Sequence, residues 1–175
     1  FPHSLGLFYT AMTQYLGFMN YGDEYKVMGL APYGKPKYID KLREIISYDK
    51  KDLFRLNLKY FLHHLGNVEM TWLNGEPKIG KVFSNDLEKL LGKQRKKDED
   101  LLQYHKDIAA STQKIFEEIL INIVNDLYEK NKNEYEIEGK KWMKKKYKFQ
   151  SRWNMRLHIK KYYDIFFEKN KKIKL

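Results

Sequence analysis

A ten-residue stretch near the start of the chain combines residue types that could hold an anion. Its sequence is YKVMGLAPYG (residues 25–34), and it contains Lys26, Gly29, Tyr33 and Gly34. Lys26 can contact a phosphate as a point charge, while two glycines and a proline so close together indicate a backbone held in a special path. A solvated surface role for Lys26 and a packing role for Tyr33 are open alternatives. The stretch is therefore a candidate segment for binding substrate or nucleotide.

A second polar pair, His3 and Ser4, stands just before a run of apolar residues. The pair could face a substrate or a metal. Serine is also a preferred residue at the start of a helix, because its hydroxyl accepts a hydrogen bond from a backbone N–H. We favour the helix-capping role and keep both residues as candidates for binding substrate or nucleotide.

The other residues that could do chemistry have simpler explanations. His63 and His64 could bind a metal, but no third ligand lies at a recognisable spacing. His105 and Asp107 precede a long apolar pattern, where Asp107 is best explained as a cap or as a favourable charge at a helix N-terminus. Ser111 lacks a histidine base in any readable arrangement, so close helix packing explains it better than nucleophilic catalysis. The sequence contains no cysteine, which excludes thiolate chemistry and disulfides, and it assigns no catalytic residue or metal ligand.

Hydrophobic spacing predicts that these residues lie mostly on or between helices. Apolar residues recur every three or four positions in several segments, which predicts helices over residues 4–16, 38–46 and 84–91. The same spacing predicts the longest helix, a well-buried one, from near residue 107 to residue 127. Alternation of Phe54, Leu56, Leu58 and Tyr60 with polar neighbours predicts a half-buried strand. Asn74-Gly75 predicts a tight turn, and residues 93–100 form a charged loop. The expected fold class is a mixed, helix-rich α/β domain.

Charge divides the chain into two parts near Lys130. The formal net charge of the chain is +11, yet residues 1–130 hold 19 Lys and Arg against 18 Asp and Glu, while residues 131–175 hold 15 against 5. The excess charge thus belongs to a Lys-rich tail. Basic residues interleaved with aromatics there could bind nucleic acid, but a solvated helical or disordered extension is the simpler interpretation. We expect no nucleic-acid partner.

Four stretches in order resemble the bacterial O-carbamoyltransferase family, which includes nodulation-factor, cephem-antibiotic and aminoglycoside carbamoylating enzymes. They are FPHSLGLFYTAMTQYLGF, YKVMGLAPYGKPKY, FSNDLEKLLG and HKDIAASTQKIFEEILINIVNDLY, and they cover about residues 1–130. Each stretch is suggestive by itself, and the four in sequence are highly specific. We therefore expect residues 1–130 to be part of the nucleotide-binding domain of such an enzyme.

The resemblance implies a fold of the actin and sugar-kinase type, in which two related α/β lobes close on a nucleotide. Family members use ATP and carbamoyl phosphate to form a carbamoyl-adenylate, and they pass the carbamoyl group to a hydroxyl of a sugar or natural-product acceptor. A divalent metal helps to hold the nucleotide. This acyl transfer needs donors for the phosphates, a means of polarising the carbonyl and a base near the hydroxyl.

The sequence departs from the family pattern at both ends. A histidine-rich metal motif and a phosphate turn would precede Phe1, and a double-glycine loop would follow the long helix, but residues 131–175 contain no Gly-Gly pair. We expect an internal fragment that is inactive alone and whose metal ligands lie outside this chain. We further expect residues 131–175 to be a divergent tail, from a shifted reading frame or an unrelated junction.

Two alternatives to the enzymatic interpretation stay open. One is a non-catalytic remnant or subunit that associates with a complementary chain, or forms a homodimer, through the apolar face of the long helix. The other is a nucleic-acid binder that acts through the basic tail. Every apolar run is shorter than the ~20 residues that a membrane span needs, so we expect a cytoplasmic protein with no membrane partner.

Overall fold

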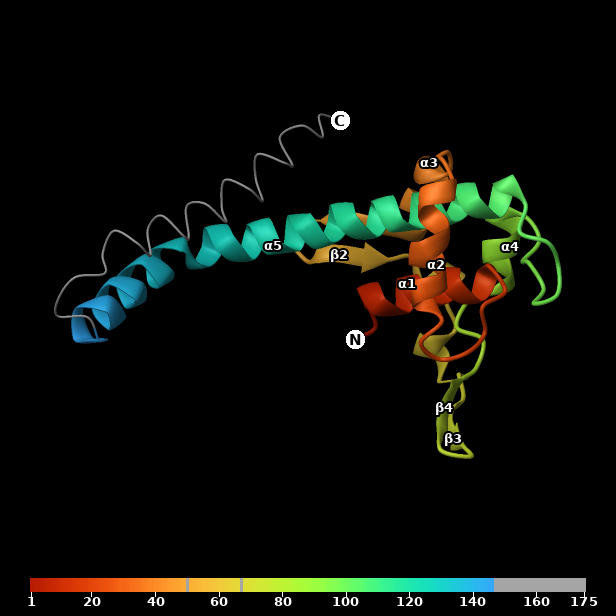
Figure 1. Ribbon diagram of the computed structural model, residues 1–175, viewed down its shortest axis with the longest axis horizontal. Coiled ribbons are helices and arrows are strands. Elements are labelled where there is room, and N and C mark those ends of the chain that lie inside the picture. Colours follow the sequence, from red (N-terminus) through yellow and green to blue (C-terminus); the bar gives the residue numbers. More distant parts are fainter. Residues whose placement is uncertain (50, 67, 147–175) are drawn as a thin grey trace. The chain divides into compact units, whose positions relative to one another are not determined.

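The structure is a computed structural model that describes residues 1–49, 51–66 and 68–146, with side chains described up to residue 130. The chain divides into two compact units, Phe1–Asp126 and Leu127–Leu175. The first unit contains all the elements discussed below except the C-terminal part of one long helix (Figure 1). Of the basic tail predicted from the sequence, only the backbone of residues 131–146 is described. The rest of that prediction lies outside the described residues.

Helix α1 (Leu5–Tyr15) begins and ends as its sequence predicts. The Ser4 hydroxyl accepts a hydrogen bond from the Leu7 N–H at 3.2 Å, which satisfies one of the N–H groups that have no partner within the helix. Gly17 follows the helix with a φ of +82°, a left-handed conformation that glycine adopts without steric cost. The capping interpretation of Ser4 is confirmed.

Helix α1 is surrounded on nearly all sides, so it forms the centre of the first unit's core. Phe8, Met12 and Tyr15 are fully buried, and burying a large apolar side chain contributes about 1.5–3 kcal/mol. The Tyr9 ring packs edge-on against Phe116 at 5.1 Å, and its hydroxyl donates to Gln113 Oε1 at 2.7 Å. The side chains of α1 thus contact segments that follow it by up to 104 residues.

Helix α2 (Glu24–Leu30), the short 3-10 helix η1 (Ala31–Tyr33) and helix α3 (Ile39–Ile45) follow α1. Pro32 lies in the first turn of η1, where its missing N–H costs nothing. Ile46, which the sequence placed in the same helix as Ile39, instead begins a strand with φ of −143°. The remainder of that helix prediction is confirmed.

The structure has two small antiparallel sheets, and only the first overlaps the single strand that alternation predicted. Strand β1 (Ile46–Asp49) pairs with β2 (Leu53–Leu56), with Ile46 opposite Leu56. The predicted continuation of the strand to Tyr60 is wrong, because residues 58–60 form the 3-10 helix η2 (Leu58–Tyr60). Asn57 causes the change: its side chain accepts a hydrogen bond from the Lys59 N–H, which competes with a strand ladder.

The second sheet is a hairpin of β3 (Met70–Leu73) and β4 (Glu76–Ile79), preceded by the 3-10 helix η3 (His63–Leu65). Its turn has Asn74 at φ +54° and Gly75 at φ +81°. Positive φ at both central residues is the requirement of a type I′ turn, so the tight-turn prediction is confirmed. The hairpin projects from the rest of the first unit (Figure 1), and every residue of β3 is exposed.

Two helices complete the described elements. Ser84 caps α4 (Asn85–Leu91) by accepting from the Asp86 N–H, as predicted. Helix α5 (Gln103–Lys146) begins four residues earlier than the Asp107 start that its sequence suggested. Its buried face is also shorter than predicted: Ile108, Ile115 and Ile119 are buried, whereas Leu120, Val124 and Leu127 are exposed.

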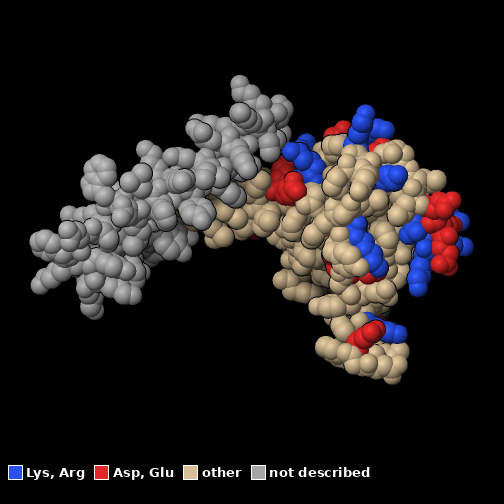
Figure 2. All heavy atoms as spheres, in the orientation of Figure 1, with Lys and Arg blue, Asp and Glu red and all other residues tan. Residues whose placement is uncertain are grey.

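The expected mixed α/β class is confirmed at this level. Within residues 1–49, 51–66 and 68–146, the strands form two antiparallel pairs and no parallel pair. Lys, Arg, Asp and Glu side chains are interspersed over the visible face of the first unit, separated by wide uncharged areas (Figure 2). This agrees with the near-balance of charge in residues 1–130.

Candidate functional site

The candidate binding segment consists of residues 24–37, which form α2, η1 and the loop that leads to α3. We call it the α2 segment. Val27 and Ala31 anchor it in the core, and the Thr10 hydroxyl of α1 donates to Glu24 Oε1 at 2.7 Å. Four of the six site residues proposed from the sequence, Lys26, Gly29, Tyr33 and Gly34, lie on it.

Lys26 forms an ion pair with Asp23, one turn earlier. The Lys26 Nζ to Asp23 Oδ1 distance is 2.7 Å, and the Asp23 side chain is 8% exposed. This hydrogen bond raises the pKa of Lys26, so the ammonium stays charged at neutral pH. A phosphate at Lys26 would therefore share the cation with a carboxylate that is already bound to it.

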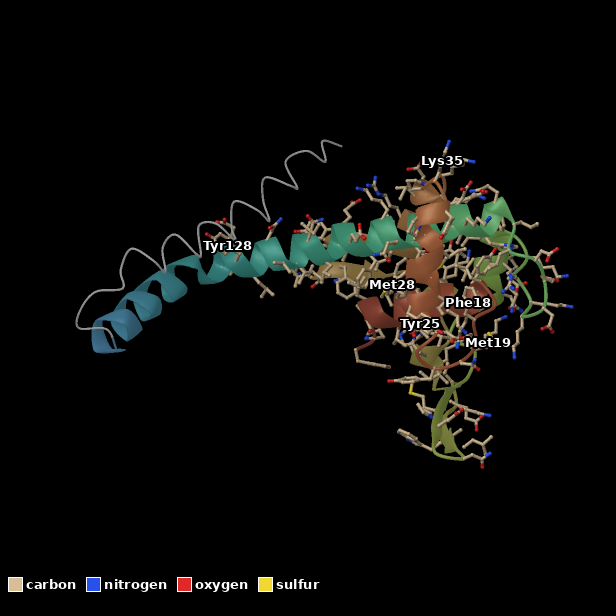
Figure 3. The ribbon with its side chains drawn as sticks, in the orientation of Figure 1. Phe18, Met19, Tyr25, Met28, Lys35 and Tyr128 are labelled. Carbon is tan, nitrogen blue, oxygen red and sulfur yellow. The ribbon has the colours of Figure 1, made fainter. Side chains whose placement is uncertain are left out.

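Two aromatic rings lie near the Lys26 ammonium. Its Nζ lies 5.7 Å from the centroid of the Phe18 ring and 5.8 Å from that of Tyr25, distances at which a cation is attracted to a ring face. Phe18 also faces the Arg95 guanidinium at 5.5 Å. Phe18, Met19, Tyr25 and Met28 lie at one end of the α2 segment, and Lys35 lies at the other (Figure 3).

The Tyr25 ring leaves an exposed surface beside Lys26. Tyr25 is 65% exposed, whereas Met28, which is 50% exposed, lies two residues after Lys26 along α2 and therefore on another side of the helix. A planar apolar group could stack there while an anionic group reached the ammonium. The sequence did not indicate Phe18, because that ring comes from the turn after α1, whose path depends on the fold.

The two glycines of the α2 segment differ in what surrounds them. A Cβ at Gly29 would meet nothing within 4 Å, whereas one at Gly34 would lie 1.9 Å from the Lys106 carbonyl oxygen. Gly34 has φ −113° and ψ 174°, which any residue can adopt. Gly34 is therefore needed for the close approach of two backbones, and Gly29 is not.

Asp107 binds the end of the α2 segment to α5. Its Oδ1 accepts from the Lys35 N–H at 2.8 Å and from Gln103 Nε2 at 2.8 Å, and its Oδ2 lies 2.8 Å from Lys37 Nζ. The side chain is 3% exposed. Hydrogen bonds from Lys37, Lys35 and Gln103 lower the pKa of this carboxyl to about 2. The prediction that Asp107 caps the helix is wrong, because the helix begins at Gln103 and the carboxylate binds a distant loop.

Two more hydrogen bonds join residues in and next to this loop to α5. Gln103 Nε2 donates to the Tyr33 carbonyl at 3.1 Å, and the Tyr38 N–H donates to Ser111 Oγ at 3.0 Å. Ser111 Oγ in turn donates to the Asp107 carbonyl at 2.7 Å. Ser111 thus has a structural role in the helix interface, in agreement with the packing interpretation.

His3 and Ser4 lie apart from the α2 segment in their hydrogen bonding. His3 Nδ1 accepts from the Leu56 N–H of β2 at 3.1 Å, and Ser4 caps α1. Among the described residues, no hydrogen bond or ion pair joins His3 or Ser4 to Lys26, Tyr33 or Gly34. The structure thus groups the candidate residues into a segment of four and a separate pair.

His63 and His64 lie in η3. His63 Nε2 is 2.7 Å from the Pro2 carbonyl, and its ring meets those of Phe1 and Phe61 edge-on. In the part of the chain that the structure describes, no group of three or more His, Asp or Glu side chains could hold a metal ion.

Two buried polar residues of the core were missed by sequence reasoning. Gln14 Nε2 donates to the Gly80 carbonyl at 3.0 Å, and its Oε1 accepts from the Val82 N–H at 2.8 Å. Arg95, which lies in the predicted charged loop, is 7% exposed. Its guanidinium donates to the carbonyls of Leu16, Lys97 and Glu99. One signal was available: Arg95 is the one arginine of residues 93–100, and a guanidinium has five donors in a fixed planar arrangement, unlike the ammonium of the lysines around it.

Comparison with known proteins places the chain in a family. The family model described as carbamoyltransferase N-terminus matches residues 1–139. The chain belongs to the carbamoyltransferase family, through part of its N-terminal domain. The matched range runs past the change in charge at Lys130, into the region that we assigned to the divergent tail.

Curated relatives support this assignment. The chain is 33% identical over 124 residues to nodulation protein NolO of Bradyrhizobium diazoefficiens, with 69% of this chain and 18% of the relative covered. It is 35% identical over 126 residues to nodulation protein NolNO of Sinorhizobium fredii, covering 71% and 15%. An uncharacterised protein of Synechocystis sp., sll1178, is 43% identical over 131 residues, covering 74% and 19%. The chain spans less than a fifth of the length of each of these relatives.

Over the described residues, no helix is both long and apolar enough to cross a membrane.

Proposed function

We propose that this chain is part of an enzyme that transfers a carbamoyl group from carbamoyl phosphate, through ATP and a carbamoyl-adenylate, to a hydroxyl of a sugar or natural-product acceptor. The chain contributes part of a nucleotide-binding domain of the actin and sugar-kinase type, works in the cytoplasm, and is inactive alone. The observation that supports this proposal most directly is the family match over residues 1–139.

The α2 segment supplies groups that suit an anionic, partly planar ligand. Lys26 offers a charged ammonium beside the exposed Tyr25 ring and the partly buried Phe18 ring, and Lys35 offers a second cation at the other end of the segment (Figure 3). Carbamoyl phosphate and ATP are both anions, and ATP also has a planar base. Interactions with their phosphates would be charge-assisted hydrogen bonds, which are about twice as strong as neutral ones.

The transfer itself needs groups that the described residues do not supply together. Acyl transfer requires a base near the acceptor hydroxyl and donors directed at the carbonyl oxygen, and residues 1–49, 51–66 and 68–130 show no such arrangement around Lys26. A divalent metal, when bound elsewhere in the enzyme, would help to hold the nucleotide. The expected role of this chain is thus to bind and orient, and not to complete the reaction.

Isothermal titration of the full 175-residue chain with ATP and magnesium, with and without carbamoyl phosphate, tests the proposal. Saturable binding supports a nucleotide site. Lys26→Met should weaken that binding about tenfold, as expected for loss of a charge-assisted contact. Absence of binding by a folded sample would contradict the nucleotide-binding role of this chain.

Lys89→Met provides the matched control. Lys89 pairs with Asp86 on α4 at 2.8 Å with the same three-residue spacing as the pair of Lys26 and Asp23. Removing Lys89 therefore costs a comparable helix ion pair away from the α2 segment. Equal weakening by both substitutions would mean that Lys26 has no specific contact with the ligand.

A second candidate function, association with a complementary chain or a second copy, is favoured by one feature of α5. Leu120, Ile121 and Val124 are each more than 40% exposed on the part of the helix that lies in the first unit. Sedimentation of the chain alone and of an Ile121→Glu variant tests it. An oligomer that the substitution dissociates supports association, and a monomer at all concentrations excludes the homodimer.

A further inference from the structure

The α2 segment is held at its start and in its middle by contacts with α1 and the core. At its start, the Glu24 carboxylate accepts a hydrogen bond from the Thr10 hydroxyl. Inside the segment, Val27 and Ala31 are buried. Its outward side chains, including Tyr25, Met28 and Tyr33, are exposed and add little packing. The loop at its end is joined to α5 by hydrogen bonds and by the packing of Gly34 against the Lys106 backbone.

Asp107 accepts two of those hydrogen bonds, from the Lys35 N–H and from the Lys37 ammonium. A carboxylate only accepts, and this one uses both oxygens: Oδ1 for the Lys35 N–H and Gln103 Nε2, and Oδ2 for the Lys37 ammonium. The bonded groups come from the loop and from the first turn of α5, so one side chain joins two elements that are 72 residues apart in sequence. A buried carboxylate without these donors would be strongly unfavourable, and the bonded loop position is therefore the stable one.

The Gly34 backbone brings the loop into reach of Asp107. Because a Cβ at Gly34 would lie 1.9 Å from the Lys106 carbonyl oxygen, only glycine allows the loop to approach this closely. The approach directs the Lys35 N–H to Asp107 while the Lys35 side chain remains exposed. Asp107 thus uses the backbone of Lys35 and leaves its ammonium available to other groups.

We propose that Asp107 is a positioning residue that fixes the end of the α2 segment on α5 and thereby sets the affinity of the segment for an anionic ligand. The part that concerns ligand affinity rests on the proposed nucleotide-binding function. Asp107 itself, being buried beneath the loop, does not contact the ligand. It acts through the placement of Tyr33 and Lys35.

The test compares the Asp107→Asn variant of the full chain with the wild-type chain. Both are measured by amide hydrogen exchange and by titration with ATP and magnesium. An asparagine can keep the bond from the Lys35 N–H, but it has no charge for the Lys37 ammonium. We expect exchange at the Lys35 amide to accelerate about tenfold relative to the Val82 amide, and ATP affinity to fall about tenfold, as for loss of a charge-assisted bond. Lys37→Met should reproduce much of both effects, and the double variant should be little worse than Asp107→Asn alone.

Glu118→Gln is the matched control. Glu118 also lies on α5 and pairs with Arg43 of α3 at 3.2 Å, but it does not touch the loop. The control should leave both the Lys35 exchange rate and the ATP affinity unchanged.

The outcomes separate this inference from the proposed function. A variant that unfolds at lower urea concentration but retains wild-type relative exchange at Lys35 overturns the positioning role. Faster exchange at Lys35 with unchanged ATP affinity overturns the link to the ligand. If the wild-type chain binds no ATP, the proposed nucleotide binding fails and the affinity claim fails with it, while the exchange result still decides whether Asp107 holds the loop.

Discussion

The α-carbon of Gly34 packs against the backbone of Lys106 so closely that a side chain at position 34 has no room. A Cβ there would lie 1.9 Å from the Lys106 oxygen and 2.7 Å from the Asp107 nitrogen. Backbone atoms cannot swing aside as a flexible side chain can. The first turns of α5 and the end of the α2 segment are therefore fitted to each other at this point, and Asp107 binds the loop directly beside it.

Replacement of Gly34 and of Gly29 by alanine should have opposite effects on stability. Gly34→Ala forces two backbones apart and should destabilise the chain by about 3 kcal/mol, at the upper end of overpacking costs. Gly29→Ala adds a methyl group into open space within α2 and should stabilise it by about 0.5–1 kcal/mol. Urea unfolding of the two full-length variants measures both. Equal effects of the two substitutions would contradict the close approach at Gly34.

The contribution of Asp107 to stability should disappear in acid. Its pKa is lowered to about 2 in the folded chain, below the usual value near 3.9 in an unfolded chain, so the folded state favours the ionised form. Its stabilisation is then fully present above about pH 5 and is lost as the pH falls towards 2. Allowing for the exposed Lys37 partner, it amounts to about 1–2 kcal/mol at neutral pH.

Urea unfolding of the wild type and of Asp107→Asn at pH 7 and at pH 3 checks this. The difference in the free energy of unfolding should be clearly smaller at pH 3. A difference that does not change with pH would mean that the carboxylate is stabilised no better in the folded chain than in the unfolded chain.

His105 should make the chain sensitive to mild acid. Burial, with a smaller contribution from the Arg95 charge, lowers its pKa, and its Nδ1 accepts from the Leu102 N–H at 3.0 Å. The folded state therefore favours neutral His105, and stability falls as the pH drops below about 6.5, the usual value for an unfolded chain. His105→Asn keeps an acceptor but does not titrate. Between pH 7.5 and 5.5, its urea midpoint should fall less than that of the wild type, and an equal fall would contradict the prediction.

Gln14 should be among the most sensitive polar positions of the core. Gln14→Ala would leave the Val82 N–H and the Gly80 carbonyl without their partner, at a cost of about 3 kcal/mol for two unsatisfied groups. Gln113→Ala is the control, because Gln113 accepts from the Tyr9 hydroxyl and bonds exposed Glu117. We expect the control to cost about 1 kcal/mol in urea unfolding. A loss at Gln14 no larger than that at Gln113 would show that the two backbone groups find other partners.

Local signals in the sequence predicted the elements whose ends are determined by adjacent residues. Ser4 and Ser84 cap their helices, and Asn74 and Gly75 form the turn of a hairpin, because each effect acts within three residues. The predicted strand over residues 54–60 was wrong in its second half, because the Asn57 side chain competes with the sheet for backbone N–H groups. Alternation alone does not reveal that competition.

The candidate site was predictable in composition but not in its connections. The four candidate residues of the YKVMGLAPYG stretch do lie on one segment, whereas His3 and Ser4 bond elsewhere. Asp107 was predicted to act at the start of its own helix, although its carboxylate binds Lys35 and Lys37, which lie 72 and 70 residues earlier in the chain. One pattern could have indicated this: Asp107 and Ser111 are four residues apart and flank apolar residues, so they share a face of the helix that meets the core.

The Gln14 bridge has a consequence for how the chain acquires its structure during synthesis. Gln14 bonds residues 66 and 68 positions later, and the Tyr15 hydroxyl bonds Tyr104, 89 positions later. An 11-residue helix such as α1 is marginal without tertiary contacts, so it must wait on the ribosome until those later segments emerge. At about 5–20 residues per second, that interval lasts several seconds, during which Phe8, Met12 and Tyr15 are open to chaperones. Contacts between residues this far apart in sequence close large loops, which should also slow refolding relative to a helical bundle of similar length.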